Sequence, residues 1–135
     1  MTTFPDGSGV RVLIVDDEFA LGKVLVMAFN KRGYQAMTVK SGAAAEHILR
    51  SEHVDCLVVD LLMPDMQGDV LFHIAAAVQP HLRHCTIFTT GDISDAAYRR
   101  IEACECPKVD KPFDMSRLLT LVQEVTQEAR EDASA

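Results

Sequence analysis

The sequence has no apolar run long enough to cross a membrane. A spanning helix needs about 20 consecutive apolar residues, and every apolar run here is much shorter. The first residues also lack the basic and apolar regions of a secretory signal peptide. We therefore expect a cytoplasmic protein that does not insert into a membrane.

Basic residues are outnumbered by acidic ones. The chain has 13 Lys and Arg against 20 Asp and Glu, which gives a formal net charge of −7. Direct binding to DNA or RNA needs a basic face that attracts phosphates. The charge balance therefore argues against a nucleic-acid partner.

Cysteine is too sparse for a disulfide framework or a zinc site. The C-x-C pair formed by Cys104 and Cys106 has no second pair and no nearby histidine to complete a zinc ligand set. Cys56 and Cys85 fall in predicted core strands, where free cysteine packs as a small apolar residue. Packing is also favoured for Cys104 and Cys106, with a redox role left open.

The chain lacks internal repeats, low-complexity tracts and signs of a second domain. Its 135 residues, 48% apolar and 24% charged, suit one soluble globular domain. Proline and glycine near the start predict a flexible leader over residues 1–9. The domain itself is expected over 10–128, and the small polar residues 129–135 predict a frayed tail.

Short apolar runs alternate with stretches of helical periodicity along the whole chain. Strands are predicted over 10–15, 34–39, 54–59, 85–89 and 108–110. Between and after them, helical stripes are expected, with end signals at Gly33, Ser41, Pro80, Asp92 or Ser94, and Asp114. The first stripe is Leu21, Val24, Leu25, Ala28 and Phe29, and the fourth is Ile93, Ala96, Ala97, Ile101 and Cys104.

This alternation predicts an α/β fold with a parallel sheet and right-handed crossovers. For five strands we expect a flavodoxin-like (βα)5 three-layer sandwich. Its five-stranded parallel sheet should have the order 2-1-3-4-5.

Four polar sites follow the predicted strands at their carboxyl ends: Asp16-Asp17, Asp60, Thr90 and Lys111. In an open parallel sheet these ends border one crevice, so the side chains should share a pocket. Clustered carboxylates would take up protons unless a cation compensated them. Magnesium is the natural candidate, because it prefers oxygen ligands and usually takes one or two carboxylates plus phosphate oxygens.

The same residue types suit phosphoryl transfer. Asp16 and Asp17 would hold the metal, and Asp60 would be free to attack phosphorus and form an aspartyl phosphate. The Lys111 ammonium and the Thr90 hydroxyl would bind the charged phosphoryl oxygens.

Each of these residues also has a structural explanation. Asp17 or Glu18 could simply cap a helix, Thr90 could be an ordinary loop threonine, and Lys111 could lie exposed at a turn. Asp60 is harder to explain in this way, because a carboxylate that ends a buried strand is costly without a partner. If all of these residues had only structural roles, their presence together at four strand ends would require four independent coincidences.

At these positions the chain resembles the receiver domain of two-component response regulators. The matching segments are VLIVDDE (12–18), VVDLLMPDMQG (58–68), IFTTG (87–91) and DKPF (110–113). The resemblance implies transfer of a phosphoryl group to Asp60 from a sensor histidine kinase or a histidine phosphotransferase. It implies a phosphoacceptor with Mg²⁺ as cofactor rather than an enzyme, and a downstream protein target. The length predicts a stand-alone receiver.

The resemblance also implies finer roles. The backbone carbonyl of Leu62 would join Asp60 as a metal ligand, while the Leu62 side chain and Asp92 would tune dephosphorylation. The Lys111-Pro112 peptide would be cis, which an X-Pro bond allows at low cost. The departures are Lys108, where receivers usually have Tyr or Phe, and the segment 104–107, where they tend to have Gly-Ala. These changes leave open how a signal would leave the pocket.

Two alternatives belong to other functional classes. An aspartyl-phosphate hydrolase of the haloacid dehalogenase class would need a D-x-D motif, but Asp16 is followed by Asp17 and Glu18. A receiver-fold interaction module that is not phosphorylated would keep the fold with a silent pocket. Lys108 is the feature that favours it.

Overall fold

A computed structural model of the protein describes residues 9–134, so nearly all of the expected leader lies outside the described residues. Its five strands form one parallel sheet of order β2-β1-β3-β4-β5. The predicted fold class and strand order are therefore confirmed. The strands are β1 (Arg11–Val15), β2 (Gln35–Val39), β3 (Cys56–Asp60), β4 (Thr86–Thr90) and β5 (Lys108–Asp110).

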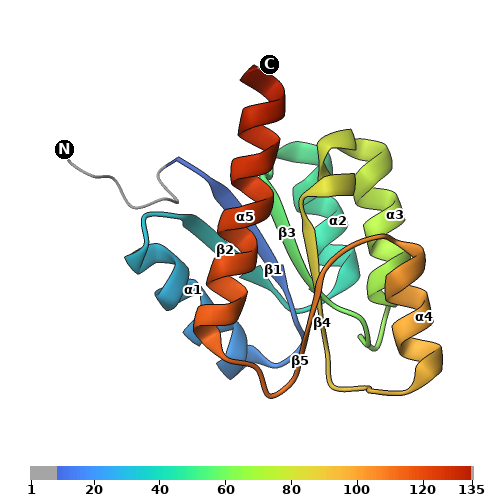
Figure 1. The fold of residues 1–135 in the computed structure, drawn as a ribbon. Helices are drawn as coiled ribbons and strands as arrows, with labels where there is room; N and C mark the ends of the chain where they lie inside the picture. The colour runs from blue at the N-terminus through green and yellow to red at the C-terminus, as the bar shows by residue number, and fades with distance from the viewer. Residues whose placement is uncertain (1–8, 135) are drawn as a thin grey trace.

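Helices cover both faces of this sheet (Figure 1). One face carries α1 (Phe19–Lys31) and α5 (Met115–Ser134), and the other carries α2 (Gly42–Ser51), α3 (Gly68–Val78) and α4 (Asp95–Ala103). A short 3-10 helix, η1 (Pro80–His84), follows α3. None of the helices in the described part of the chain is long and apolar enough to span a membrane.

Alternating residues of the central strands supply two separate cores. In β1, Val12 and Ile14 pack with α1 and α5, whereas Leu13 and Val15 pack with α2 and α3. All five residues of β3 are buried. Continuous apolar strands are expected wherever helices cover both faces of a parallel sheet. The two cores therefore explain why β1 has no polar residue after Arg11 and β3 has none before Asp60.

The predicted stripes of the first and fourth helices were partly wrong. Val24 is 53% exposed, because α1 turns Leu25 and Phe29 toward the sheet. Ile93 is 70% exposed and precedes α4, and Ala96 is also exposed. The reason is that Ser94, not Asp92, is the N-cap: its hydroxyl accepts a hydrogen bond from the backbone N–H of Ala97.

The last helix is longer than the sequence pattern indicated. We expected helical structure to give way to a frayed tail near Glu128, but α5 continues to Ser134. Its red end projects past the edge of the sheet in Figure 1. Residues 127–134 contain neither glycine nor proline and include Glu, Ala and Arg, which favour helix, so nothing in the sequence ends it earlier.

Candidate functional site

The candidate site lies where β1, β3, β4 and β5 end, at the lower edge of the sheet in Figure 1. Asp16 and Asp17 follow β1, and Asp60 is the last residue of β3. One carboxylate oxygen from each of these three residues lies within 4.8 Å of the other two. Parallel topology thus gathers acidic groups that are up to 44 residues apart in the chain.

Lys111 supplies the positive charge at the centre of this cluster. Its Nζ lies 2.8 Å from Asp16 Oδ2, 2.9 Å from Asp60 Oδ2 and 3.1 Å from Glu18 Oε1. Burial alone would lower the pKa of Lys111, but its hydrogen bonds to Asp16 and Asp60 outweigh burial and raise the pKa. The lysine is therefore fully protonated at neutral pH and bridges the carboxylates.

Asp60 is a buried carboxylate, with 5% of its surface exposed. Burial raises its pKa above the ordinary value, while the hydrogen bond and charge of Lys111 and the backbone N–H of Leu62 act in the opposite direction. That N–H donates to Oδ1 at 3.2 Å. One oxygen of Asp60 thus faces the ammonium and the other faces the loop that follows β3.

Glu18 also joins the acidic cluster, although the sequence left it undecided between a helix cap and a ligand. It occupies the N-cap position of α1, but its side chain makes no capping hydrogen bond and reaches Lys111 instead. Its backbone N–H donates to Asp16 Oδ1 at 2.8 Å. The only sequence signal was its place directly after the acidic pair in a strand-end loop.

Gly68 allows the loop after β3 to close tightly against Asp60. A Cβ atom at this position would lie 2.3 Å from the backbone oxygen of Asp60 and 2.9 Å from Leu61 Cα. The Gly68 N–H donates to the Leu61 carbonyl at 2.7 Å, so α3 begins directly against the end of β3. Only glycine fits this approach without moving the backbone beneath Asp60.

The same loop is also attached to the N-terminus of α2. The carboxylate of Asp65 accepts hydrogen bonds from Gly42 N at 3.1 Å and Ala43 N at 3.0 Å. These two backbone N–H groups lower the pKa of Asp65. Met66 packs so closely on Gly42 that a Cβ there would lie 2.7 Å from the Met66 Cβ. The segment that carries Leu62 is therefore held at both ends, and the Leu62 side chain is 41% exposed.

Thr90 lies at the end of β4, but its hydroxyl is directed to its own loop. It accepts a hydrogen bond from the Asp92 N–H at 3.0 Å and donates to the Asp92 carbonyl at 3.2 Å. Within residues 9–134, no hydrogen bond joins this hydroxyl to Asp60 or Lys111. The Thr90 carbonyl accepts from Lys111 N at 2.7 Å, and the peptide bond between Lys111 and Pro112 is cis.

All four cysteines are free thiols, and Cys56, Cys85 and Cys104 are buried. Burial raises the pKa of Cys85 to about 11 and that of Cys106 to about 12. The thiolate is the nucleophilic form of cysteine, so a raised pKa makes a thiol unreactive at neutral pH. The arrangement agrees with packing and gives no support to redox chemistry at the C-x-C pair.

The donor set of the acidic cluster fits a hard divalent cation. Asp16, Asp17 and Asp60 offer carboxylate oxygens in one place, without sulfur or imidazole ligands. Magnesium prefers such oxygen ligands and keeps several of its waters. The exposed position of Asp17 beside two buried carboxylates leaves one side of the cluster open to water.

The five-stranded parallel sheet of order β2-β1-β3-β4-β5, covered by helices on both faces, defines the class of flavodoxin-like α/β domains. The family model described as the response regulator receiver domain matches residues 12–123. The chain belongs to the response regulator receiver domain family. A receiver domain protein, described as CheY-like, from Methanospirillum hungatei JF-1 has a TM-score of 0.84 to this structure. It is 22% identical in sequence, and the match covers 91% of this chain and 98% of that chain.

Curated relatives include both short and long proteins. The response regulator receiver protein CpdR of Brucella abortus is 30% identical over 116 residues, which cover 85% of this chain and 95% of CpdR. The regulatory protein AtoC of Escherichia coli is 32% identical over 124 residues, covering 87% of this chain but 25% of AtoC. Other curated relatives are also much longer, and the chain spans 12% to 48% of their length.

Proposed function

We propose that Asp60 accepts a phosphoryl group in a magnesium-dependent reaction and that this modification controls binding to another protein. The observation that carries the proposal is the double contact of Lys111 with Asp16 and Asp60, at 2.8 and 2.9 Å, inside a cluster of three carboxylates. Asp16, Asp17, Asp60 and the Leu62 carbonyl would hold the ion. When bound, Mg²⁺ would neutralise charge on the phosphoryl oxygens.

The proposed reaction is a displacement at phosphorus. A carboxylate oxygen of Asp60 forms the new bond to phosphorus, and the bond from phosphorus to the donor breaks. In a phosphohistidine donor, the electron pair of the broken P–N bond goes to the imidazole nitrogen. The Lys111 ammonium, which touches Asp60 at 2.9 Å, is close enough to turn to an oxygen of the transferred group.

The remaining residues of the pocket act on the product in this proposal. The Thr90 hydroxyl would exchange its contact with the Asp92 carbonyl for a phosphoryl oxygen, since it donates only a weak 3.2 Å hydrogen bond now. The exposed Leu62 side chain and Asp92 would regulate access of the hydrolytic water. The role of Thr90 on the product and the roles of Leu62 and Asp92 in hydrolysis are those that the family resemblance implies.

The expected partners are a sensor histidine kinase or a histidine phosphotransferase upstream, and a protein target downstream. The expected cytoplasmic location suits such partners. The stand-alone organisation stays a prediction, and the intact mass of the protein isolated from its native cell tests it.

A receiver-fold module that is not phosphorylated is the second candidate. It is favoured by Lys108, which replaces the aromatic ring expected in β5, and by the Thr90 hydroxyl, which is hydrogen-bonded to its own loop. Both features concern the response to phosphorylation, whereas the acidic cluster and Lys111 concern the reaction itself. We therefore favour the phosphoacceptor.

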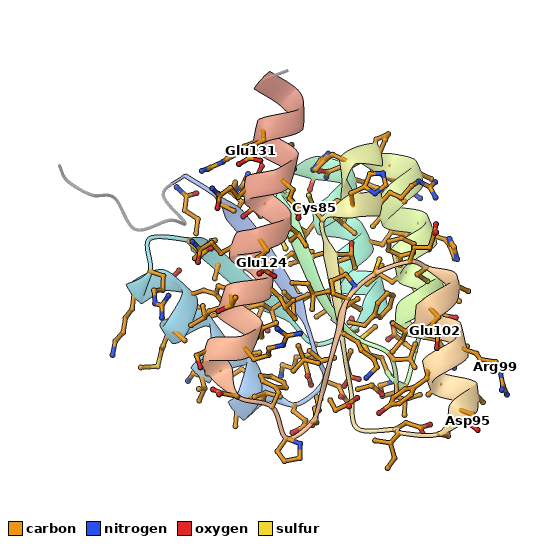
Figure 2. The ribbon with its side chains drawn as sticks, viewed as in Figure 1. Cys85, Asp95, Arg99, Glu102, Glu124 and Glu131 are labelled. Carbon is orange, nitrogen blue, oxygen red and sulfur yellow. The ribbon has the colours of Figure 1, made fainter. Side chains whose placement is uncertain are left out.

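Incubation with acetyl phosphate, with and without Mg²⁺, tests the proposal. Intact-mass measurement should show a gain of ~80 Da, one phosphoryl group, in the wild type only when Mg²⁺ is present. Asp60→Asn should show no gain, and Glu131→Gln, a matched neutralisation at the far end of α5 (Figure 2), should behave like the wild type. An unmodified wild-type protein would favour the silent module.

A further inference from the structure

Helix α4 is held to the domain by few apolar contacts. Only Ala97 and Ile101 of its nine residues are buried, whereas five of the eleven residues of α3 are buried. Asp95, Arg99 and Glu102 are exposed, and Arg99 points away from the domain in Figure 2. Segments with few buried apolar contacts open at low free-energy cost. The polar contacts of α4 therefore decide how firmly it is docked.

Three polar links join α4 to the neighbourhood of the site. The first starts at Thr90, whose hydroxyl is hydrogen-bonded to the backbone of Asp92. The Asp92 carboxylate accepts from the N–H of Ser94 at 2.8 Å, and Ser94 caps α4. A change in the hydrogen bonds of the Thr90 hydroxyl can therefore alter the first turn of α4 through Asp92 and Ser94.

The second link joins α4 to the start of α3. The guanidinium of Arg100 forms a bidentate ion pair with Asp69, with Nε 3.0 Å from Oδ2. The same guanidinium lies 3.4 Å from Gln67 Oε1. Arg100 lowers the pKa of Asp69, as expected for a tight ion pair. Asp69 adjoins Gly68, which closes on the carbonyl of Asp60.

The third link joins α4 to β5. The Tyr98 hydroxyl donates to Asp110 Oδ2 at 3.0 Å, and Lys108 Nζ lies 3.1 Å from Oδ1 of the same carboxylate. The Lys108 ammonium also lies 4.0 Å from the centre of the Tyr98 ring, in a cation–π contact. Asp110 directly precedes Lys111. An aromatic ring therefore does lie against β5, but it is the ring of Tyr98 on α4, which contacts the Lys108 ammonium.

We propose that Tyr98, Lys108 and Asp110 form a latch that docks α4 on β5, and that phosphorylation of Asp60 opens this latch. The coupling rests on the proposed function. Asp110, which accepts the hydrogen bonds of the latch, directly precedes Lys111, so a shift of the end of β5 as Lys111 turns to a phosphoryl group would move the latch acceptor. At the same time Thr90 gives up its donation to Asp92, which loosens the first turn of α4. Opening of the latch would expose Tyr98 of α4 and Lys108 of β5.

Hydrogen exchange of the α4 amides, 95–103, measures the latch directly. Tyr98→Phe keeps the ring but removes the hydrogen bond to a charged acceptor, so exchange of these amides should rise about tenfold without any phosphoryl group. Arg99→Met, on the outward face of the same helix, is the matched control and should leave the exchange unchanged. Equal exchange in Tyr98→Phe and wild type would overturn the latch.

The coupling is tested by adding beryllofluoride and Mg²⁺, a phosphoryl mimic for carboxylates. Exchange of the α4 amides should rise in the wild type and change much less in Tyr98→Phe, where the latch is already open. Linkage is reciprocal, so beryllofluoride should also bind Tyr98→Phe more tightly than wild type. Binding without a change in α4 would overturn the coupling alone. If acetyl phosphate adds no mass to Asp60, the proposed function fails, while the exchange of Tyr98→Phe without the mimic still decides the latch.

Discussion

Replacing Asp60 with asparagine should make the magnesium-free protein more stable at neutral pH. The Asp60 carboxylate is buried, and its pKa in the folded protein is raised above the ordinary value of 3.8, chiefly by burial. Between these two pKa values the folded state binds more protons than the unfolded state. Stability is therefore lost as the pH rises through that interval, and the ionised carboxylate destabilises the fold at pH 7.

The expected gain follows from the size of such shifts. One pKa unit corresponds to ~1.4 kcal/mol, and the ammonium of Lys111 at 2.9 Å already compensates part of the burial cost. Asparagine has the same shape without the charge, so we expect Asp60→Asn to gain about 1 kcal/mol at pH 7.5. The gain should shrink as the pH falls through the raised pKa of Asp60, because the buried carboxylate itself then takes up a proton.

Magnesium should reverse the order of the two proteins. A ligand that binds only the folded state at ten times its dissociation constant stabilises it by ~1.4 kcal/mol. The wild type should gain this stability and Asp60→Asn much less, because it lacks one of the clustered carboxylates.

Urea unfolding followed by far-ultraviolet circular dichroism is the suitable assay, since the chain has no tryptophan. At each pH, unfolding of the two proteins with and without Mg²⁺ gives the four free energies that are compared. Glu131→Gln changes the net charge equally and is the control. The reasoning is refuted if Asp60→Asn is less stable than wild type in magnesium-free buffer at pH 7.5.

Three further predictions concern the backbone at Gly68, with Gly91 as its control, the backbone at Glu105, and the charge of Lys111. Gly68→Ala should destabilise the fold by about 2 kcal/mol and slow phosphorylation by acetyl phosphate, because its Cβ would lie 2.3 Å from the Asp60 carbonyl; Gly91→Ala, with open space around its Cβ, should change unfolding by less than ~0.5 kcal/mol. Glu105→Gly should stabilise by about 1 kcal/mol in thermal unfolding, because Glu105 has a φ of 56° in the left-handed region; an unchanged melting temperature would contradict this. Lys111→Met should destabilise the magnesium-free protein by about 3 kcal/mol at neutral pH, since two buried carboxylates lose their cation. The loss should shrink on acidification, and a loss independent of pH would disprove the electrostatic explanation.

The sequence predicted those parts of the fold that depend on burial from both sides. β1 and β3 are continuous apolar runs, and such runs end where the chain leaves the sheet, which placed Asp16 and Asp60 at strand ends. Even the short β5 was predicted over the observed residues, 108–110. The strand order followed from general rules for parallel sheets rather than from particular residues.

Helix ends were harder to predict, because capping is decided by backbone geometry. Asp92 and Ser94 are equally good capping residues in a sequence. In the structure the backbone N–H of Asp92 donates to the Thr90 hydroxyl. Helix α4 therefore starts two residues later than a cap at Asp92 would place it, after Ser94, and Ile93 is exposed. At the end of α5 the sequence contains no helix stop signal. Fraying was predicted only because the residues there are small and polar, and that prediction was wrong.

The site was predicted as a set of residues but not as a set of contacts. Nothing in the sequence shows that Glu18 turns from helix capping to Lys111, or that the Thr90 hydroxyl faces Asp92. Both depend on side-chain directions in loops. The pairing of Lys108 with Tyr98 joins residues on different elements, so the sequence could reveal the missing aromatic residue in β5 but not its substitute.

The most direct test of the central claim is to locate the phosphoryl group on the chain. After treatment with acetyl phosphate and Mg²⁺, hydroxylamine converts an acyl phosphate to a stable hydroxamate, and peptide sequencing by mass spectrometry identifies the modified residue. The proposed function predicts one modified carboxylate, at Asp60, that is absent without Mg²⁺. Modification at Asp16, Asp17 or elsewhere, or none at all, would contradict it.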